Sequence, residues 1–270
     1  MLKRGIRGHD VRESTLESVC GKMKDIGLEY IQLVLEKSIS GFGYGQYSEE
    51  YAKEIKRLLG DRKIAILGSY INASTPDDEL LKYEIARFKE KILYAKTLNP
   101  IAVGTETGIY KEGLTHTEEA YLRLRDTIRE LVKEGEKQGV NVAVEGVHLL
   151  VINTPKLMKR LADDMNSDYF KVIFDPVNYI NINNYQNQDD MICELFDTLH
   201  DKLVAIHVKD FVVEDGRMKS AKPGEGLLNF DLIFKKVKEY GLDIPFITED
   251  ISEETSVEVF KAFEEKYEAI

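Results

Sequence analysis

Eight short apolar runs alternate with longer amphipathic stretches along this 270-residue chain, and the alternation constrains its fold more than any other feature. The runs are Arg4–Gly8, Tyr30–Glu36, Lys63–Ile71, Pro100–Thr105, Asn141–Gly146, Phe170–Asp175, Leu203–Val208 and Ile244–Glu249. Several are apolar at almost every position, which is typical of parallel strands that are covered on both faces. Strands that alternate with helices favour a parallel sheet, and eight such units favour closure into a (β/α)8 barrel. An open doubly wound sheet is the alternative that the pattern leaves.

The stretches between the runs have the periodicity and the end signals of helices. Asp78–Leu98 carries apolar residues at three- and four-residue steps, which predicts one long helix. Thr75-Pro76 and Thr154-Pro155 each place a capping hydroxyl before a proline, which predicts a helix start at both places. Glycines stand where helices should end: Gly27, Gly60, Gly139 and Gly241. Because no linker or low-complexity tract interrupts the series, we predict a single α/β domain, a TIM barrel, over residues 1–270.

The composition argues against several classes of partner. Hydrophobic residues make up 43% of the chain and charged residues 31%, enough for a buried core and a solvated surface. The net charge of −11 argues against nucleic acid or a membrane surface, since binding a polyanion requires clustered Lys and Arg. No run approaches the length of a membrane span, and the first residues, MLKRGIRGHD, lack the apolar core of a signal peptide. Cys20 and Cys193 stand alone like reduced thiols, so we expect a cytoplasmic protein; the sequence is compatible with a homo-oligomer.

Four of the eight runs carry a metal-ligating side chain at or near their ends. These residues are Glu145, Asp175, His207 and Glu249, each about 30 to 40 positions after the previous one, close to the length of a strand–helix unit. Corresponding ends of successive strands in a parallel barrel converge on one mouth, where the chemistry takes place. One glutamate at a strand end is usually a solvated carboxylate, and one histidine in LVAIHV is as easily a core residue. All four in register predict a divalent-metal site.

Three carboxylates and one imidazole are ligands that suit a single Mn²⁺, Mg²⁺ or Co²⁺ ion, with Zn²⁺ a further candidate. Four protein ligands on an octahedral ion leave two positions for water or for adjacent oxygens of a polyol or keto-sugar. An ion bound in this way would polarise the carbonyl and stabilise an enediolate. Proton transfer at the neighbouring carbon then requires carboxylates positioned over the substrate. The predicted partner is therefore a small-molecule sugar.

Over essentially its whole length the chain resembles the xylose-isomerase-like TIM barrels, which include sugar isomerases, ketose 3-epimerases, inosose dehydratases and endonuclease-IV-type enzymes. The segments that carry the resemblance are VAVEG, FDPVN, HVKD, KPGEGLLNFD and ITED. The resemblance implies that the metal ligands are Glu145, Asp175, His207 and Glu249. It implies that Glu145 and Glu249 also flank the substrate and move its proton, and that the other two are ligands only. The loop that contains Pro223–Gly226 resembles one that helps to close the site.

Four further residues are candidates for contacts with the substrate: His148, Asn178, Lys209 and Glu106. Asn178 stands where many members of the family have a histidine, and its neutral amide could still bind a hydroxyl. Lys209 follows His207 by two residues and so shares its side of the strand, with a structural salt bridge as the alternative. Glu106 ends the fourth run. His148 follows the strand-five glutamate by three residues, with a plain surface position as its alternative.

Two loop segments also bear on the site. Gly41–Tyr47, GFGYGQY, superficially suggests a phosphate-binding loop but lacks the G-x-G-x-x-G spacing at a helix entry. We expect instead a mobile loop whose aromatic side chains cover the sugar. His9, in the loop after the first run, could reach the mouth as well.

The expected function is a metal-dependent isomerase or epimerase of a small keto-sugar, or of its phosphate, acting through an enediolate. A dehydratase (lyase) of the inosose or dehydroshikimate type is the first alternative, because it would begin with the same proton abstraction. A non-catalytic, metal-holding carbohydrate-binding barrel is the second. An endonuclease-IV-type activity is disfavoured, since it needs a histidine cluster for three zinc ions and the chain has 5 histidines, mostly misplaced.

Overall fold

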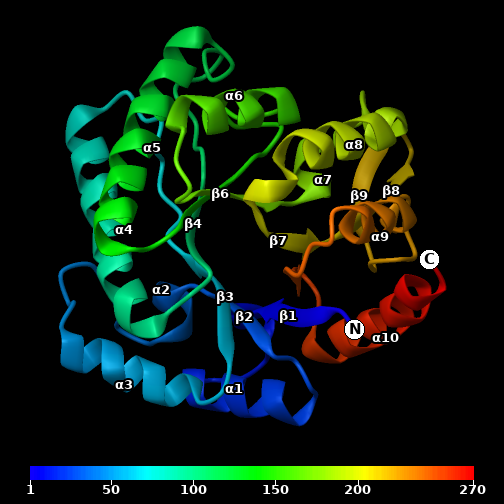
Figure 1. Ribbon diagram of the computed structural model, residues 1–270, viewed down its shortest axis with the longest axis horizontal. Helices are drawn as coiled ribbons and strands as arrows, with labels where there is room; N and C mark the ends of the chain where they lie inside the picture. The colour runs from blue at the N-terminus through cyan, green and yellow to red at the C-terminus, as the bar shows by residue number, and fades with distance from the viewer.

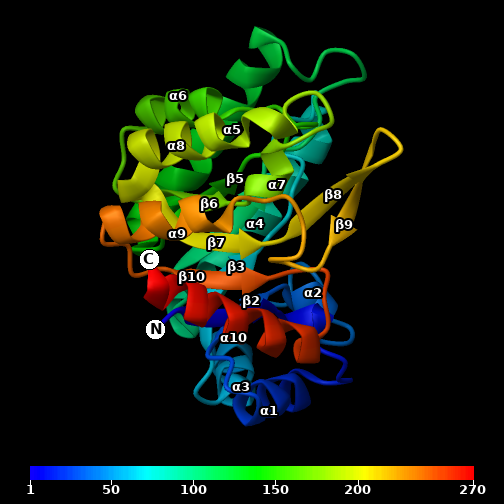
Figure 2. The same cartoon turned by 90° about the vertical axis from the view of Figure 1, so that its right-hand side faces the viewer.

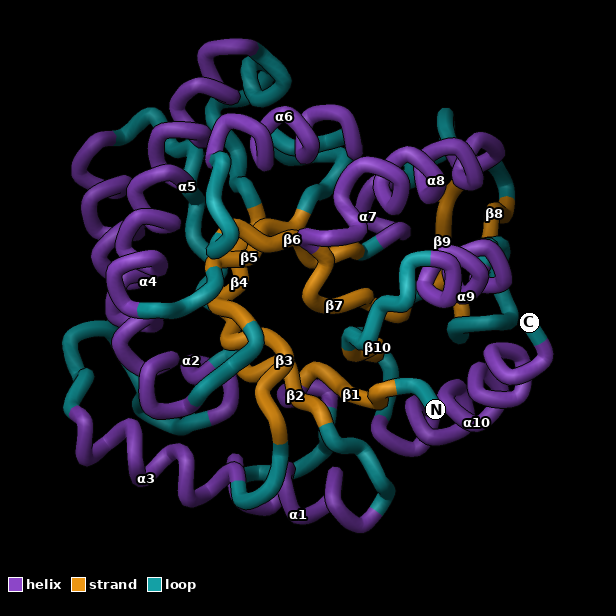
Figure 3. The backbone as a smooth tube through the Cα atoms, in the orientation of Figure 1, coloured by secondary structure: helices purple, strands orange, loops and turns teal.

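The computed structural model describes residues 1–270 and contains a closed barrel of parallel strands (Figure 1, Figure 3). Its strands are β1 (Lys3–Arg7), β2 (Tyr30–Leu33), β3 (Lys63–Gly68), β4 (Ala102–Glu106), β5 (Val142–Glu145), β6 (Phe170–Phe174), β7 (Leu203–Val208) and β10 (Pro245–Thr248). Their order round the barrel is β1, β10, β7, β6, β5, β4, β3, β2, and β1 closes it by pairing with both β10 and β2. The predicted (β/α)8 barrel is confirmed, and each apolar run supplies one barrel strand.

Helices surround the barrel (Figure 3). They are α1 (Leu16–Asp25), α2 (Leu35–Ser38), α3 (Glu49–Leu59), α4 (Asp78–Leu98), α5 (Glu118–Gln138), α6 (Pro155–Met165), α7 (Pro176–Tyr179), α8 (Gln188–Leu199), α9 (Phe230–Glu239) and α10 (Glu253–Ala269). Short 3-10 turns lie at Gly8–Asp10, Tyr185–Asn187 and His200–Lys202. None of these helices combines the length and the apolar character needed to cross a membrane.

The helix ends follow the predicted signals with one exception. Thr154 caps α6 as predicted, with Pro155 at the first helical position. The predicted cap at Thr75 is wrong, because α4 begins at Asp78 and is capped by Asp77. The Asp77 carboxylate accepts hydrogen bonds from the backbone N–H groups at positions 79 and 80, and its charge also suits the positive end of the helix dipole. The four glycines predicted to end helices all have positive φ.

Two packed regions hold the barrel together. The larger one comprises 63 buried residues, in which the helices pack on the outside of the strands. The second comprises 9 buried residues, all from barrel strands. A Cβ atom added at Gly104 in β4 would lie 2.5 Å from Ile66 and 2.8 Å from Ile173. Side chains of β3 and β6 therefore meet over Gly104, and side chains fill the barrel interior below the site.

A β-hairpin interrupts the strand–helix alternation after β7. It consists of β8 (Asp210–Glu214) and β9 (Arg217–Ala221), and it projects beyond the ends of β7 and β10 (Figure 2). The turn residues Asp215 and Gly216 have φ of 51° and 71°. Asp-Gly is a favoured pair for such a turn, because both central residues need positive φ. Strand β8 thus follows the site-bearing strand β7 directly and begins at the mouth.

Candidate active site

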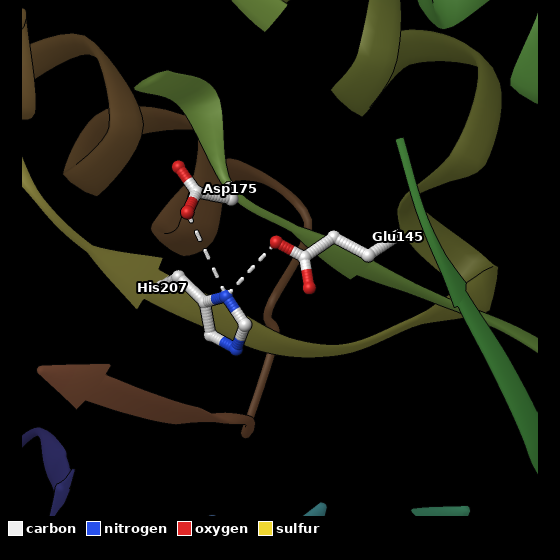
Figure 4. Close-up of side chains that lie close together, drawn as sticks. All are labelled: Glu145, Asp175 and His207. Carbon is white, nitrogen blue, oxygen red and sulfur yellow. Dashed lines mark hydrogen bonds and ion pairs between the residues drawn. The ribbon is translucent and has the colours of Figure 1, made fainter. Parts of the chain in front are cut away.

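The four predicted metal ligands meet at the carboxyl ends of their strands. Glu145 is the last residue of β5, Asp175 follows β6, His207 lies in β7, and Glu249 follows β10. Their relative exposures are only 2%, 0%, 0% and 4%. His207 Nδ1 lies 3.2 Å from Glu145 Oε1, 3.7 Å from Asp175 Oδ2 and 3.6 Å from Glu249 Oε1. Figure 4 shows one nitrogen of the His207 ring facing the carboxylates of both Glu145 and Asp175.

These side chains have the chemistry of a divalent-metal site. The donor atoms of Glu145, Asp175 and His207 all lie within 4.8 Å of one another, and Glu249 lies beside this group. Asp175 Oδ2 is buried and accepts no hydrogen bond of good geometry. Buried carboxylates at this density are unfavourable unless cations compensate their charge. Three oxygen donors and one imidazole nitrogen that converge in this way fit Mn²⁺, Mg²⁺, Co²⁺ or Zn²⁺.

Gln32 in β2 links two of these residues, and the sequence analysis missed it. Its Oε1 lies 2.7 Å from His207 Nε2, and its Nε2 donates to Glu249 Oε1 at 2.8 Å. The same Nε2 lies 2.6 Å from the hydroxyl of Tyr70, to which it donates. Since the amide NH₂ faces a carboxylate, the amide oxygen faces His207 and accepts the Nε2–H proton. Gln32 therefore directs the other ring nitrogen, Nδ1, at the carboxylates.

Lys209 supplies positive charge to the same group, as the shared side of the strand predicts. Its Nζ lies 2.9 Å from Asp175 Oδ2 and 2.7 Å from Glu249 Oε2. Burial alone would lower the pKa of the Lys209 ammonium, but these two carboxylates raise it above its ordinary value. Burial alone would raise the pKa of Asp175, but Lys209 and His207 hold it below its ordinary range. At neutral pH the group is thus a lysine cation among ionised carboxylates.

A cavity of about 150 Å³ opens beside the predicted ligands. It is lined by Arg7, His9, Lys37, Tyr70, Glu106, Glu145, Lys209 and Glu249. Burial and the neighbouring Glu145 charge raise the pKa of Glu106 to about 7. Burial, Glu145 and Glu249 raise the pKa of Tyr70 as well. The cavity therefore offers hydroxyl, carboxyl and ammonium groups to a small polar molecule.

The four candidates for substrate contact fall into two groups. Glu106 and Lys209 line the cavity, as expected of residues that touch a substrate. Asn178 Nδ2 instead donates to Glu145 Oε1 at 2.6 Å, so the amide orients that carboxylate. His148 is not among the lining residues, and its Nδ1 lies 3.1 Å from the backbone oxygen of Asn178.

The Gly41–Tyr47 loop packs against the outer helix α4. Phe42 and Tyr47 both contact Tyr94, with ring centroids 5.4 and 5.0 Å apart, and none of the loop residues lines the cavity. Backbone N–H groups of the loop donate to the carboxylate of Glu90 in α4, at 2.7 and 2.9 Å. The expected aromatic cover over the sugar is therefore absent from this arrangement, because the aromatic rings are used in packing.

The loop that contains Pro223–Gly226 is organised by Asp210, the first residue of β8. The buried Asp210 carboxylate accepts hydrogen bonds from the backbone N–H groups of Phe211, Gly224, Gly226 and Leu228, at 2.8 to 2.9 Å. A Cβ atom at Gly226 would lie only 2.3 Å from Asp210 Oδ1, so the close approach requires glycine. The last residue of the HVKD segment thus holds this loop next to the mouth.

Comparisons with known proteins agree with this architecture. The model of the xylose isomerase-like TIM barrel family matches residues 20–267. L-ribulose-5-phosphate 3-epimerase UlaE of Escherichia coli O157:H7 (strain EC4115 / EHEC) is 21% identical over 250 residues, which cover 88% of this chain and 84% of that protein. The crystal structure of a D-tagatose 3-epimerase-like protein superposes with a TM-score of 0.79 at 20% identity, covering 99% of this chain and 98% of the other.

A second solved structure is relevant to the predicted metal. The IOLI protein, crystallised with a bound zinc atom, has a TM-score of 0.74 at 18% identity, and the match covers 98% of this chain and 96% of the other. At such identities the two solved structures show a common fold. The family model, which spans most of the sequence, shows more: the chain belongs to the xylose isomerase-like TIM barrel family.

Proposed function

We propose that this protein is a divalent-metal-dependent epimerase or isomerase of a small keto-sugar. The observation that carries the proposal is the convergence of Glu145, Asp175, His207 and Glu249, all buried, beside a small polar cavity. That relatives of similar length bear the names of sugar 3-epimerases supports it. A divalent ion held by the four residues would serve as a Lewis acid toward the substrate carbonyl.

The two glutamates are suited to moving a proton on opposite faces of a sugar. Glu145 ends β5 and Glu249 follows β10, and β7 and β6 separate these strands round the barrel. Both carboxylates line the cavity. Asn178 orients the first, whereas Gln32 and Lys209 orient the second. We propose that one glutamate removes the proton beside the carbonyl and the other returns a proton, while Glu106 binds a hydroxyl.

Isotope exchange tests this reaction directly. The protein is incubated in D₂O with a panel of ketoses, inososes and dehydroshikimate, and the recovered compounds are analysed by mass spectrometry and NMR. Solvent deuterium at the carbon next to the carbonyl, in recovered or epimerised sugar, is the expected result. Loss of water would identify a dehydratase instead, and no exchange with any compound would point to a binding protein. Glu249→Gln serves as the matched control for residual exchange.

The metal is tested apart from turnover. Elemental analysis after gentle purification is expected to give about one equivalent of divalent ion, and His207→Ala is expected to lower it strongly. Full metal content in that variant would remove His207 from the site. We further propose that the enzyme works in the cytoplasm, where Cys20 and Cys193, which form no disulfide, would stay reduced.

A further inference from the structure

The Tyr70 side chain lines the cavity in a fixed position just after β3. A Cβ atom added at Gly68, the last residue of β3, would lie 2.9 Å from Tyr70 Cε2, so the glycine leaves the room that the ring occupies. Burial raises the pKa of the Tyr70 hydroxyl, and the three carboxylates that line the cavity raise it further, so the hydroxyl lies near all of them. Tyr70 is thus placed to touch a bound molecule, and the proposed reaction gives it no role.

The Tyr70 hydroxyl has a hydrogen-bond donor but no acceptor. Gln32 Nε2 donates to it at 2.6 Å and to Glu249 Oε1 at 2.8 Å. The orientation of the amide is fixed, because an ionised carboxylate can only accept and must face the NH₂ group. An amide NH₂ group does not accept hydrogen bonds, so the phenol proton must point elsewhere. No other group of the protein accepts it, which leaves this proton for an oxygen atom of a ligand.

The same amide places the hydroxyl beside Glu249. The Tyr70 oxygen and Glu249 Oε1 are both bonded to one nitrogen, so they lie within two hydrogen-bond lengths of each other. Lys209 holds the other oxygen of Glu249 at 2.7 Å, which fixes the carboxylate from its second side. A carbon from which Glu249 takes a proton has the carbonyl oxygen only two bonds away. A substrate in contact with Glu249 therefore has this oxygen within reach of the Tyr70 hydroxyl.

We propose that Tyr70 is a further catalytic residue, whose hydroxyl donates a hydrogen bond to the carbonyl oxygen of the keto-sugar. The inference rests on the proposed function and adds a residue to it. When Glu249 takes the proton next to the carbonyl, the C–H electron pair forms a carbon–carbon double bond and the carbonyl pair moves onto the oxygen. Tyr70 keeps its own proton and shares it with this oxygen, so it stabilises the new charge. Glu145 then returns a proton to the other face, and both glutamates recover their starting state by exchange with water.

Tyr70→Phe removes the hydroxyl and keeps the ring. Loss of one donor to a developing oxyanion typically lowers kcat about 10²–10³-fold, and we expect this loss in the D₂O exchange assay with little change in KM. Tyr121→Phe is the matched control, because it also removes a tyrosine hydroxyl, one that donates to Asp164 at 2.5 Å between the outer helices α5 and α6. The control should keep its turnover. An unchanged kcat in Tyr70→Phe would overturn the inference.

Titration with Mn²⁺ distinguishes a catalytic hydroxyl from one that only supports Gln32. Phenylalanine leaves the contacts of Gln32 with His207 and Glu249 in place, so Tyr70→Phe should bind Mn²⁺ as tightly as the wild type. The same titration shows that the variant is folded. Metal affinity lowered about 10- to 100-fold, as expected when a group that orients a ligand is lost, would make Tyr70 a support of Gln32 and overturn its catalytic role.

Binding of glycolohydroxamate tests the inference without turnover. The planar O–C–N–O group of this small anion resembles an enediolate, so its affinity reports on groups that stabilise the developing charge. With Mn²⁺ present, Tyr70→Phe should bind it about ten-fold or more weakly than the wild type. Equal binding, with deuterium exchange by the wild type, would overturn the role of Tyr70 and leave the epimerase standing. Binding that depends on Tyr70, without exchange on any sugar, would keep the hydroxyl as a donor to an oxyanion and remove the epimerase.

Discussion

Replacing Gln32 by leucine should weaken metal binding even though Gln32 is not among the predicted ligands. Its amide contacts His207 Nε2 at 2.7 Å, Glu249 Oε1 at 2.8 Å and the hydroxyl of Tyr70 at 2.6 Å. Leucine is similar in size but can neither accept the imidazole proton nor donate to the carboxylate. Without the amide, the histidine ring can adopt the wrong tautomer, and Glu249 loses its fixed orientation.

The magnitude follows from the contacts that are lost. Each buried polar group left without a partner is destabilising by about 1–3 kcal/mol, and the site cavity admits water that restores part of this. We expect Gln32→Leu to lower the free energy of unfolding by about 2–4 kcal/mol. Loss of a group that orients a metal ligand typically lowers metal affinity about 10- to 100-fold, and we expect the same here for Mn²⁺ and Zn²⁺.

Urea unfolding of the metal-free protein and calorimetric titration with each ion measure the two effects separately. Asn141→Leu is the matched control, because it also removes an amide hydrogen bond, the partly buried one from Asn141 Nδ2 to Ile101 O at 2.9 Å. That bond lies at the amino end of β5, away from the mouth, so the control should lose stability and keep its metal affinity. Unchanged metal affinity in Gln32→Leu, with the stability loss present, would refute the orienting role of Gln32.

Three further predictions concern the roles of two predicted ligands, the loop held by Asp210, and nucleic acid. Asp175→Asn should lose activity mainly because it binds metal more weakly, so excess Mn²⁺ should restore its turnover. Glu249→Gln should keep a turnover rate about 10²–10⁴-fold below wild type even at saturating metal. Equal rescue of both variants in steady-state assays would make Glu249 a ligand only. Gly226→Ala should lower stability in urea by about 1–3 kcal/mol, because its Cβ would meet Asp210 Oδ1 at 2.3 Å, and an unchanged midpoint would contradict that packing. Incision of an abasic duplex, measured on gels with added zinc, should be undetectable given the net charge of −11, and incision would favour a nuclease.

The barrel and the convergence of the four predicted ligands could be predicted from the sequence because both depend on local patterns. Each apolar run predicts a strand. A residue at the carboxyl end of any barrel strand lies at the mouth, so its place there does not depend on the order of the strands. Glu145, Asp175, His207 and Glu249 therefore meet as expected. The predicted helix start at Thr75 is wrong for a local reason, since Asp77, two residues later, is a better cap and lies directly before the helix.

The residues that the sequence did not reveal depend on contacts across the barrel. Gln32 is a lone polar residue within YIQLVL, and a polar side chain inside an otherwise buried run was the one signal that could have singled it out. Arg7, Tyr70 and Lys37 stand in no motif, and their place at the cavity follows only from how β1, β2 and β3 close on the other strands. The pair Asp215-Gly216 is a sequence signal for the turn of the hairpin. A regular repeat of strands and helices does not lead one to expect a hairpin at that position.

The closure of the barrel brings together residues that the candidate site needs. The strands that meet at the seam between the chain's two ends are β2, β1 and β10. Gln32 lies 217 residues from Glu249 and 175 from His207, yet it fixes both. Arg7 approaches Glu249 across the same seam at 3.5 Å. A sheet opened at this seam would still bring the predicted ligands of β5, β6 and β7 together but would lose all three contacts, so the orientation of Glu249 depends on the closed barrel.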